Sequence, residues 1–329
     1  MDIRLARPTD VPHIVALILD EHAHIVNSGA WSDSRPSVRS VSRALVPFAS
    51  KGRLWIVRDG ESTALLEAQP RRYVIGWDIT RLAVRGDPER ILSPAVGTAL
   101  EHVQRHGVPR LFARCLERYR GLLERCGFRS LGKEYVLLGS GALSPHPAGL
   151  PEDSRYRMPP DAWPLHQLES DTTPAEIRQL EGLTSLDWAQ GSRGMEEIVV
   201  ERDGEIVAWV GWEPGTGRRK RLGLLVRPDY RELGSDLLAY VLERTPPAVS
   251  FVARVRGYQQ EVLSLFEESG FHVAAEEMLM LRHANVQPAR SESARMRIAH
   301  VPGIQAFPFH LASGIFGPEI AGPLKDKIT

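Results

Sequence analysis

The chain repeats itself at a nearly constant offset, which limits the folds open to it. Residues 55–60 return as residues 199–204, residues 82–84 as residues 224–226, and residues 126–138 as residues 269–281, at offsets of 144, 142 and 143. The two copies of the first landmark read Trp-Ile-Val-Arg-Asp-Gly and Val-Val-Glu-Arg-Asp-Gly. This period is far longer than the roughly 20 to 50 residues of a solenoid repeat. The sequence therefore predicts a duplicated domain.

Length and composition agree with a globular protein of two domains. The chain has 329 residues, of which 43% are hydrophobic and 25% charged, and these fractions are ordinary for globular proteins. Its net charge is zero, so no overall field attracts nucleic acid or an anionic membrane. We expect neither as a partner, and nothing indicates the oligomeric state. Two cysteines, no signal-peptide pattern and no long apolar run favour a cytoplasmic protein.

Glycine and proline mark the predicted domain boundaries. They are dense between residues 139 and 160, as is typical of a linker. The last 45 residues have no counterpart in the repeat, and they are too apolar for a free tail. The predicted division is an N-terminal domain at 1–140, a linker at 141–160, a C-terminal domain at 161–284 and a tail at 285–329 that packs back on the body.

Both copies show the same order of strand and helix patterns. A strand and a helix are followed by three strands, then by helix, strand, helix and strand. The capping box at residues 173–176 predicts the first helix of the second copy. From Thr9 to Asp59 the numbering rises by 50, whereas from Thr173 to Asp203 it rises by 30, so about 20 residues are expected to be missing there. The predicted fold class is α/β (α+β), with a mixed, mostly antiparallel sheet flanked by helices in each domain.

Four stretches carry a resemblance to a known family. Residues 224–231 (Leu-Leu-Val-Arg-Pro-Asp-Tyr-Arg) end a predicted strand, and residues 265–271 (Leu-Phe-Glu-Glu-Ser-Gly-Phe) end a late helix. Residues 122–128 repeat the second pattern, and residues 3–10 have the form of a first strand and helix start. With the element order, these stretches resemble the GNAT acyltransferase superfamily in two tandem copies. Mycothiol synthase is such a tandem pair, and only its architecture is similar.

The resemblance implies a cofactor site. In this family two strands diverge after the fourth strand, their free backbone groups pair with the pantetheine arm, and the next helix N-terminus receives the pyrophosphate. Residues 85–90 of the first copy form no recognisable phosphate cradle, whereas residues 231–236 retain one glycine in a shortened loop. The second copy is therefore expected to bind acetyl-CoA or another acyl-CoA. The implied contacts are Leu224, Leu225 and Val226 with pantetheine, and Arg231, Leu233, Gly234 and Ser235 with pyrophosphate.

The implied activity is acyl transfer to a small amine, which needs a base and an acid. Asp78, on the predicted fourth strand of the first copy, is the candidate base; the alternative is a strand-edge aspartate in solvent. The position where the family often has an acidic tyrosine holds Leu123 in one copy and Phe266 in the other. Tyr258, Tyr119 or solvent would replace it, unless both tyrosines only complete helix stripes.

A function of another class stays open. Since both copies lack the usual acid, the protein is alternatively a non-catalytic CoA-ligand sensor or a scaffold. The acceptor is not indicated either, because residues 27–50, which should shape its site, hold no interpretable motif. His102 and His106 lie four apart but have no acidic partner motif, so no metal site is expected.

Overall fold

The computed structural model of the protein describes most of the two repeats. The described residues are 1–27, 52–71, 76–108, 110–141, 149–191, 194–214 and 218–284. The predicted acceptor wall, apart from Asn27, and the predicted tail lie outside these ranges. None of the helices in the described ranges is long and apolar enough to cross a membrane.

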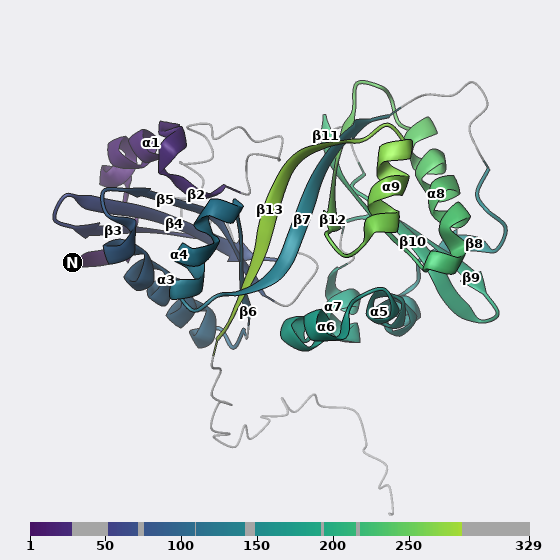
Figure 1. The fold of residues 1–329 in the computed structure, drawn as a ribbon, viewed down its shortest axis with the longest axis horizontal. Helices are drawn as coiled ribbons and strands as arrows, with labels where there is room; N and C mark the ends of the chain where they lie inside the picture. Colours follow the sequence, from purple (N-terminus) through teal and green to yellow (C-terminus); the bar gives the residue numbers. More distant parts are fainter. Residues whose placement is uncertain are drawn as a thin grey trace, which may run out of the picture. The chain divides into compact units, whose positions relative to one another are not determined.

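The repeats share one element order (Figure 1). The first contains β1 (Asp2–Leu5), α1 (Val11–Leu19), β2 (His24–Asn27), β3 (Arg53–Asp59), β4 (Ser62–Pro70), β5 (Trp77–Arg85), α3 (Pro88–Arg105), β6 (Arg110–Cys115), α4 (Arg120–Arg125) and β7 (Arg129–Ser140). The second contains β8 (Ser154–Tyr156), α5 (Ala162–Asp171), α6 (Ala175–Glu181), α7 (Ser185–Gly191), β9 (Glu196–Arg202), β10 (Glu205–Trp212), β11 (Arg219–Val226), α8 (Arg231–Glu243), β12 (Ser250–Arg256), α9 (Gln260–Glu268) and β13 (His272–His283). The predicted order is confirmed, with β2, α6 and α7 in addition.

The last strands of the two repeats are exchanged. In the sheet order β1-β3-β4-β5-β6-β13-β7-β12-β11-β10-β9-β8, β13 pairs with β6 of the first repeat and β7 pairs with β12 of the second. Figure 1 shows β7 and β13 side by side, as their antiparallel pairing requires. We call β1–β6 with β13 the N-lobe, and β7–β12 the C-lobe. Because residues 1–287 form one compact unit, the predicted boundary between two domains stays a prediction.

The cores follow this exchange. Met278 and Met280 of β13 belong to the apolar cluster of the N-lobe, between its sheet and α3. Leu137 of β7 belongs to the cluster that α8 and α9 make with the C-lobe sheet. A smaller cluster on another part of the C-lobe sheet joins α5 to β9 and β10. Burial of apolar side chains is the main stabilising contribution to a fold. The exchanged strands are therefore integral parts of the lobes that receive them.

The beginning of the second repeat differs from its prediction. β8 and a short 3-10 helix occupy residues 154–161, most of which fall in the range predicted as a linker. Asp161 there matches Asp10 of the first repeat. From Asp10 to Asp59 the numbering rises by 49 and from Asp161 to Asp203 by 42, so the difference is 7 residues rather than 20. The capping box at residues 173–176 precedes α6, a second helix of the repeat, and this caused the misalignment.

Candidate functional site

β11 and β12 of the C-lobe diverge part-way along their length. They pair in parallel from Arg219 opposite Ser250 to Leu222 opposite Ala253. β11 then continues to Val226, and on this side it has no further strand partner in the described part of the chain. We call this place the C-lobe divergence. It lies where the resemblance implies a pantetheine site.

The peptide groups of β11 alternate in direction, which decides the groups that face the divergence. Arg221 O accepts from Glu213 N, and Arg227 N donates to Val207 O, both at 3.0 Å, so the odd-numbered residues bond to the β10 side. The N–H and C=O groups of Leu224 and Val226 therefore point away from β10 and toward the divergence. An extended ligand chain at this edge would find a donor and an acceptor on each of these residues.

The corresponding place in the N-lobe is filled. β5 pairs with β6 only from Trp77 to Ile79, so these strands also diverge. Beyond that point β2 pairs antiparallel with β5, with His24 opposite Ala83 and Asn27 opposite Arg81. The edge that would receive a pantetheine arm is thus already used by the chain itself.

The helix that follows each divergence also differs between the lobes. In the N-lobe, Asp87 caps α3: its carboxylate accepts from Glu89 N at 3.0 Å, and Pro88 begins the helix. This carboxylate occupies the place that a bound anion would take, and its negative charge would repel one. In the C-lobe, the N-cap of α8 is Tyr230, whose side chain makes no capping bond. The C-lobe helix is the more open of the two to an anionic group.

The predicted pyrophosphate residues lie in the first turns of α8. Arg231 donates from Nη2 to both carboxylate oxygens of Glu268 on α9, at 2.6 and 2.7 Å. Leu233 is half-buried against the C-lobe core, and Ser235 is exposed. A Cβ atom on Gly234 would lie 2.8 Å from Cδ1 of Leu265, so the glycine lets α8 pack closely. The predicted pyrophosphate contact of these residues stays a prediction.

Asp78, the predicted base, is held by two guanidinium groups. Its Oδ1 lies 3.3 Å from Nη1 of Arg114, and its Oδ2 lies 3.3 Å from Nε of Arg71. The side chain is 19% exposed. It is therefore not the solvent-exposed aspartate of the alternative, because both of its oxygens are paired. Its role as a base stays a prediction.

Tyr258, the predicted acid, follows β12. Its hydroxyl donates to Oγ1 of Thr173 at 3.5 Å, and burial raises the pKa of the phenol. A phenol with a raised pKa keeps its proton at neutral pH, as an acid must. Tyr119, the other candidate, is packed against the N-lobe core, as the stripe interpretation expects.

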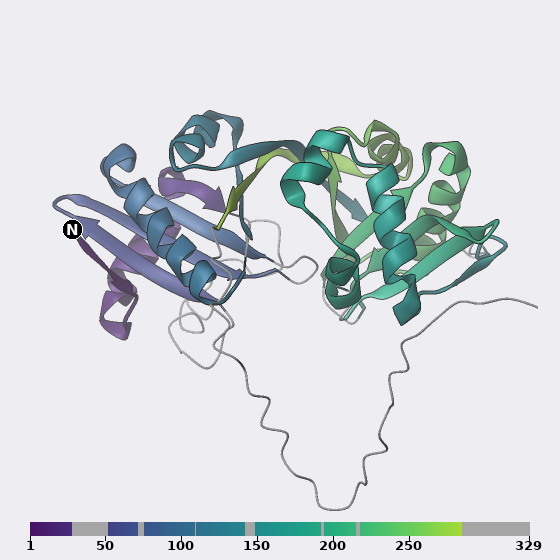
Figure 2. The same ribbon diagram turned by 90° about the horizontal axis from the view of Figure 1, so that it is seen from below.

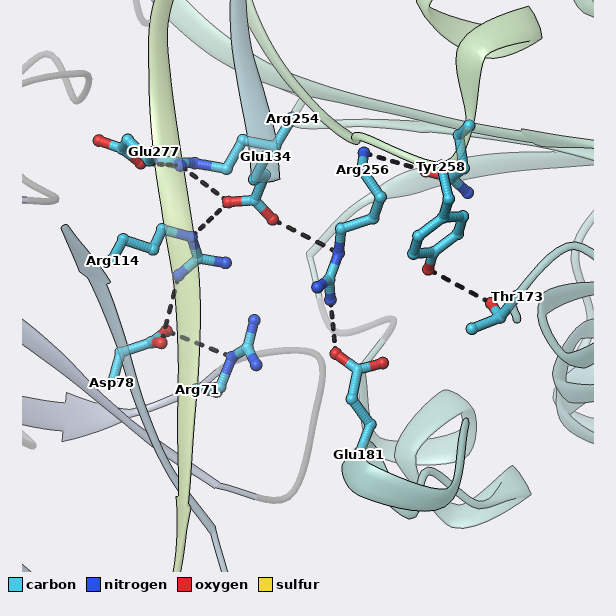
Figure 3. A network of polar contacts seen from close by, with 11 residues as sticks. Arg71, Asp78, Arg114, Glu134, Thr173, Glu181, Arg254, Arg256, Tyr258 and Glu277 are labelled. Atoms are coloured by element: carbon cyan, nitrogen blue, oxygen red, sulfur yellow. Dashed lines mark hydrogen bonds and ion pairs between the residues drawn. The ribbon is translucent and has the colours of Figure 1, made fainter. Parts of the chain in front are cut away.

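Asp78 belongs to a polar network, and Tyr258 lies beside the other end of that network (Figure 3). From Asp78 the network passes to Arg114, to Glu134 of β7 at 2.5 Å, and to Arg256 of β12, whose Nε lies 3.5 Å from Glu134. Arg256 also donates to Glu181 of α6 at 2.6 Å. The structure thus places Tyr258 beside the network that contains Asp78, and its own hydrogen bond goes to Thr173 outside that network.

Glu169 of α5 was not a candidate in the sequence. Its Oε2 accepts from Trp188 Nε1 at 2.7 Å. Burial raises the pKa of this carboxyl to about 7. No motif marks the position, because the shift comes from the packing of α5 against α7. His102, in contrast, is edge-on to Trp55 and Trp77 at 5.5 and 5.1 Å between ring centroids, and burial lowers its pKa to about 4.

Comparison with known proteins supports the fold. No family model and no curated protein matches the chain. A GCN5-related N-acetyltransferase from Sphaerobacter thermophilus is similar with a TM-score of 0.50 and 18% identity, over 86% of this chain and 95% of that one. A tandem GNAT protein from the clavulanic acid biosynthesis pathway has a TM-score of 0.47 and 15% identity, over 86% and 98%. A GCN5-related N-acetyltransferase from Anabaena variabilis has 0.43 and 11%, over 87% and 73%.

The first of these similarities is the one that bears on the fold. At 18% identity it shows a shared fold and nothing of the activity. The chain therefore has the GNAT fold, as the resemblance implies. The two copies of the element order described above make it a tandem arrangement of that fold.

Proposed function

We propose that the protein is an acyl-CoA-dependent N-acyltransferase. Its C-lobe binds acetyl-CoA or another acyl-CoA, and the acyl group passes to a small amine. The observation that carries this proposal is the contrast between the two divergences. In the C-lobe, the peptide groups of Leu224 and Val226 face a place where no strand of the described residues pairs with them, whereas β2 fills that place in the N-lobe.

The residues present fit an acyl-CoA at the C-lobe. The pantetheine arm is a chain of amides, and it would pair with the free groups of Leu224 and Val226 as an added strand does. The thioester supplies the activated acyl group. The α8 N-terminus lacks a side-chain cap, so its N–H groups and dipole favour an anion. Tyr258 holds a proton that the departing thiolate needs.

Matched proline variants test the site. Val226→Pro removes an N–H group from the C-lobe divergence, and Val84→Pro makes the same change at the equivalent N-lobe position, 142 residues earlier. Calorimetric titration of the wild-type protein with acetyl-CoA should give one site per chain. Val226→Pro should weaken binding about tenfold or more, since it loses a hydrogen bond and leaves an amide of the ligand unpaired. Val84→Pro should bind like the wild type, provided that both variants melt cooperatively.

The outcome also separates the enzyme from the alternative. Absence of acetyl-CoA binding would remove both the enzyme and a CoA-ligand sensor, and would leave a scaffold. Binding that survives Val226→Pro but not Val84→Pro would place the site in the N-lobe. When binding is found, release of free CoA thiol in the presence of a panel of primary amines tests catalysis. Binding without release over the whole panel would favour the sensor.

A further inference from the structure

One of the buried or half-buried acids of the helices α5–α7 and the neighbouring strand β9 has no cationic partner in the described part of the chain. Five acids in this region are buried or half-buried, and within the described ranges four of them pair with arginine. These pairs are Glu181 with Arg256 at 2.6 Å, Asp187 with Arg110 at 2.9 Å, Glu197 with Arg157 at 3.1 Å, and Glu201 with Arg155 at 3.0 Å. The fifth, Glu169, accepts the indole N–H of Trp188 instead. A carboxylate removed from water without a cation is a place where a cationic group binds favourably.

A chain of packed aromatic rings links Glu169 to the C-lobe divergence. Trp188, which donates to Glu169, lies edge-on to Trp209 with 5.2 Å between ring centroids. Trp209 lies against β11: a Cβ atom on Gly223 would be 3.0 Å from its Cζ3. Leu225, in the diverging part of β11, packs against the same apolar cluster. Glu169 therefore lies on the face of the C-lobe sheet from which the Leu225 side chain projects.

We propose that Glu169 takes the proton from the ammonium group of the acceptor amine, a role that rests on the proposed acyl transfer. The acceptor is then a primary amine that arrives as a cation. Its N–H proton passes to the Glu169 carboxylate, and the nitrogen lone pair attacks the thioester carbonyl carbon. The C–N bond forms and the C–S bond breaks. A second nitrogen proton ends on the CoA thiolate, and Glu169 returns its proton to solvent.

The charges around Glu169 suit a base that works near neutrality. Burial raises its pKa to about 7, the carboxylates of Glu181 and Asp187 act in the same direction, and Trp188 and Arg256 oppose them. The phenol of Tyr258 lies close enough to Glu169 for the charge of this carboxylate to raise the pKa of the phenol. A base is most effective when its pKa is near the working pH, because it is then both ionised and able to hold a proton.

Glu169→Gln tests the proposal, with Glu176→Gln on the exposed surface of α6 as the control. In Glu169→Gln, acetyl-CoA binding should be unchanged by calorimetry, while kcat/KM for the amine should fall about 10²- to 10⁴-fold. The wild type and Glu176→Gln should both show kcat/KM rising with pH through about 7, and Glu169→Gln should lose this rise. Trp188→Phe, which removes the hydrogen bond to the carboxylate, should move the rise to higher pH.

Each result decides one question. If the wild type does not bind acetyl-CoA, the proposed function fails and this role fails with it. If the wild type binds acetyl-CoA but acylates no amine of the panel, the catalytic role of Glu169 is overturned. If it acylates an amine and Glu169→Gln keeps both the rate and the pH profile, only the assignment of Glu169 is overturned.

Discussion

Arg254 of β12 donates from Nη1 to Oε2 of Glu134 on β7, with 3.0 Å between the two atoms. β7 closes the first repeat and β12 belongs to the second, so this ion pair joins the two copies. The same carboxyl accepts from Arg114 at 2.5 Å. Burial alone would raise the pKa of Glu134, but Arg114, Arg254 and Arg256 hold it well below its usual range. Glu134 therefore joins β6 of the first repeat to β12 of the second (Figure 3). The strand that carries it, β7, lies beside β13 in both ribbon views (Figures 1 and 2).

We expect Glu134→Gln to destabilise the protein by about 3–5 kcal/mol, because it leaves three arginines without their shared anion. Urea unfolding at pH 7 measures this change. The control is Glu276→Gln, which breaks an exposed pair with Lys133 and should change stability little. Since the pKa of Glu134 is lowered on folding, its contribution is present above the unfolded value of 4.5 and is lost as the pH falls below it. Equal, small effects of the two variants would contradict this account.

The pKa of Glu169 gives a pH dependence of the opposite sign. Its folded value of about 7 lies above the unfolded value of 4.5, so the folded state keeps a proton that the unfolded state has lost. The contribution of the neutral carboxyl is complete below pH 4.5 and disappears as the pH rises through 7. We therefore expect Glu169→Gln, which cannot ionise, to gain stability relative to the wild type over this range, by at most about 3 kcal/mol. Thermal melts of both proteins at pH 4.5, 6 and 8 check it, and a difference that does not vary with pH would contradict it.

Much of the fold was predictable because its signals are local. Alternating and helical apolar patterns predicted most of the strands and helices, because each pattern depends only on residues close together in the sequence. The β9–β10 turn is a clear case, since Asp203 and Gly204 both have positive φ, at 53° and 80°, as the favoured two-residue hairpin requires. The same residue pair at Asp59 and Gly60 made the repeat visible, although the turn of the first repeat lies one residue later, at Gly60 and Glu61.

The start of the second repeat was missed although a signal exists. Arg4 donates to both carboxylate oxygens of Asp10 at 2.6 and 2.9 Å, and Arg155 does the same to Asp161 at 2.6 and 2.9 Å. The arginine and aspartate are six residues apart in both repeats. A match of only two residues is a weak sequence signal, and the prolines around it favoured a linker.

The exchange of β7 and β13 was not predictable from the offsets. Offsets compare the order of elements along the chain, whereas pairing depends on which lobe each strand reaches. Most strands pair with a neighbour in sequence, so the simple expectation keeps each repeat to itself. The link from Asp78 to the second repeat was hidden for the same reason, because Arg114, which pairs with Asp78, also pairs with Glu134, and Glu134 pairs with Arg254 of β12.

Two glycines of the C-lobe sheet make room for Trp209, and this predicts a further variant. A Cβ atom on Gly211 would overlap the indole ring of Trp209. Gly211→Ala should therefore cost about 1–3 kcal/mol, as overpacking of a core does, and should displace Trp209 from Trp188. Urea unfolding followed by tryptophan fluorescence reports both changes.

Gly97→Ala is the matched control for that variant. Gly97 lies inside α3, and nothing lies within 4 Å of the position of its Cβ atom. The same substitution there should be neutral or should stabilise the protein by up to about 1 kcal/mol, because alanine favours a helix. Since Trp209 supports the indole that holds Glu169, Gly211→Ala should also lower amine acylation without weakening acetyl-CoA binding. A Gly211→Ala protein as stable and as active as Gly97→Ala would show that the position of the Trp209 indole does not depend on a glycine at residue 211.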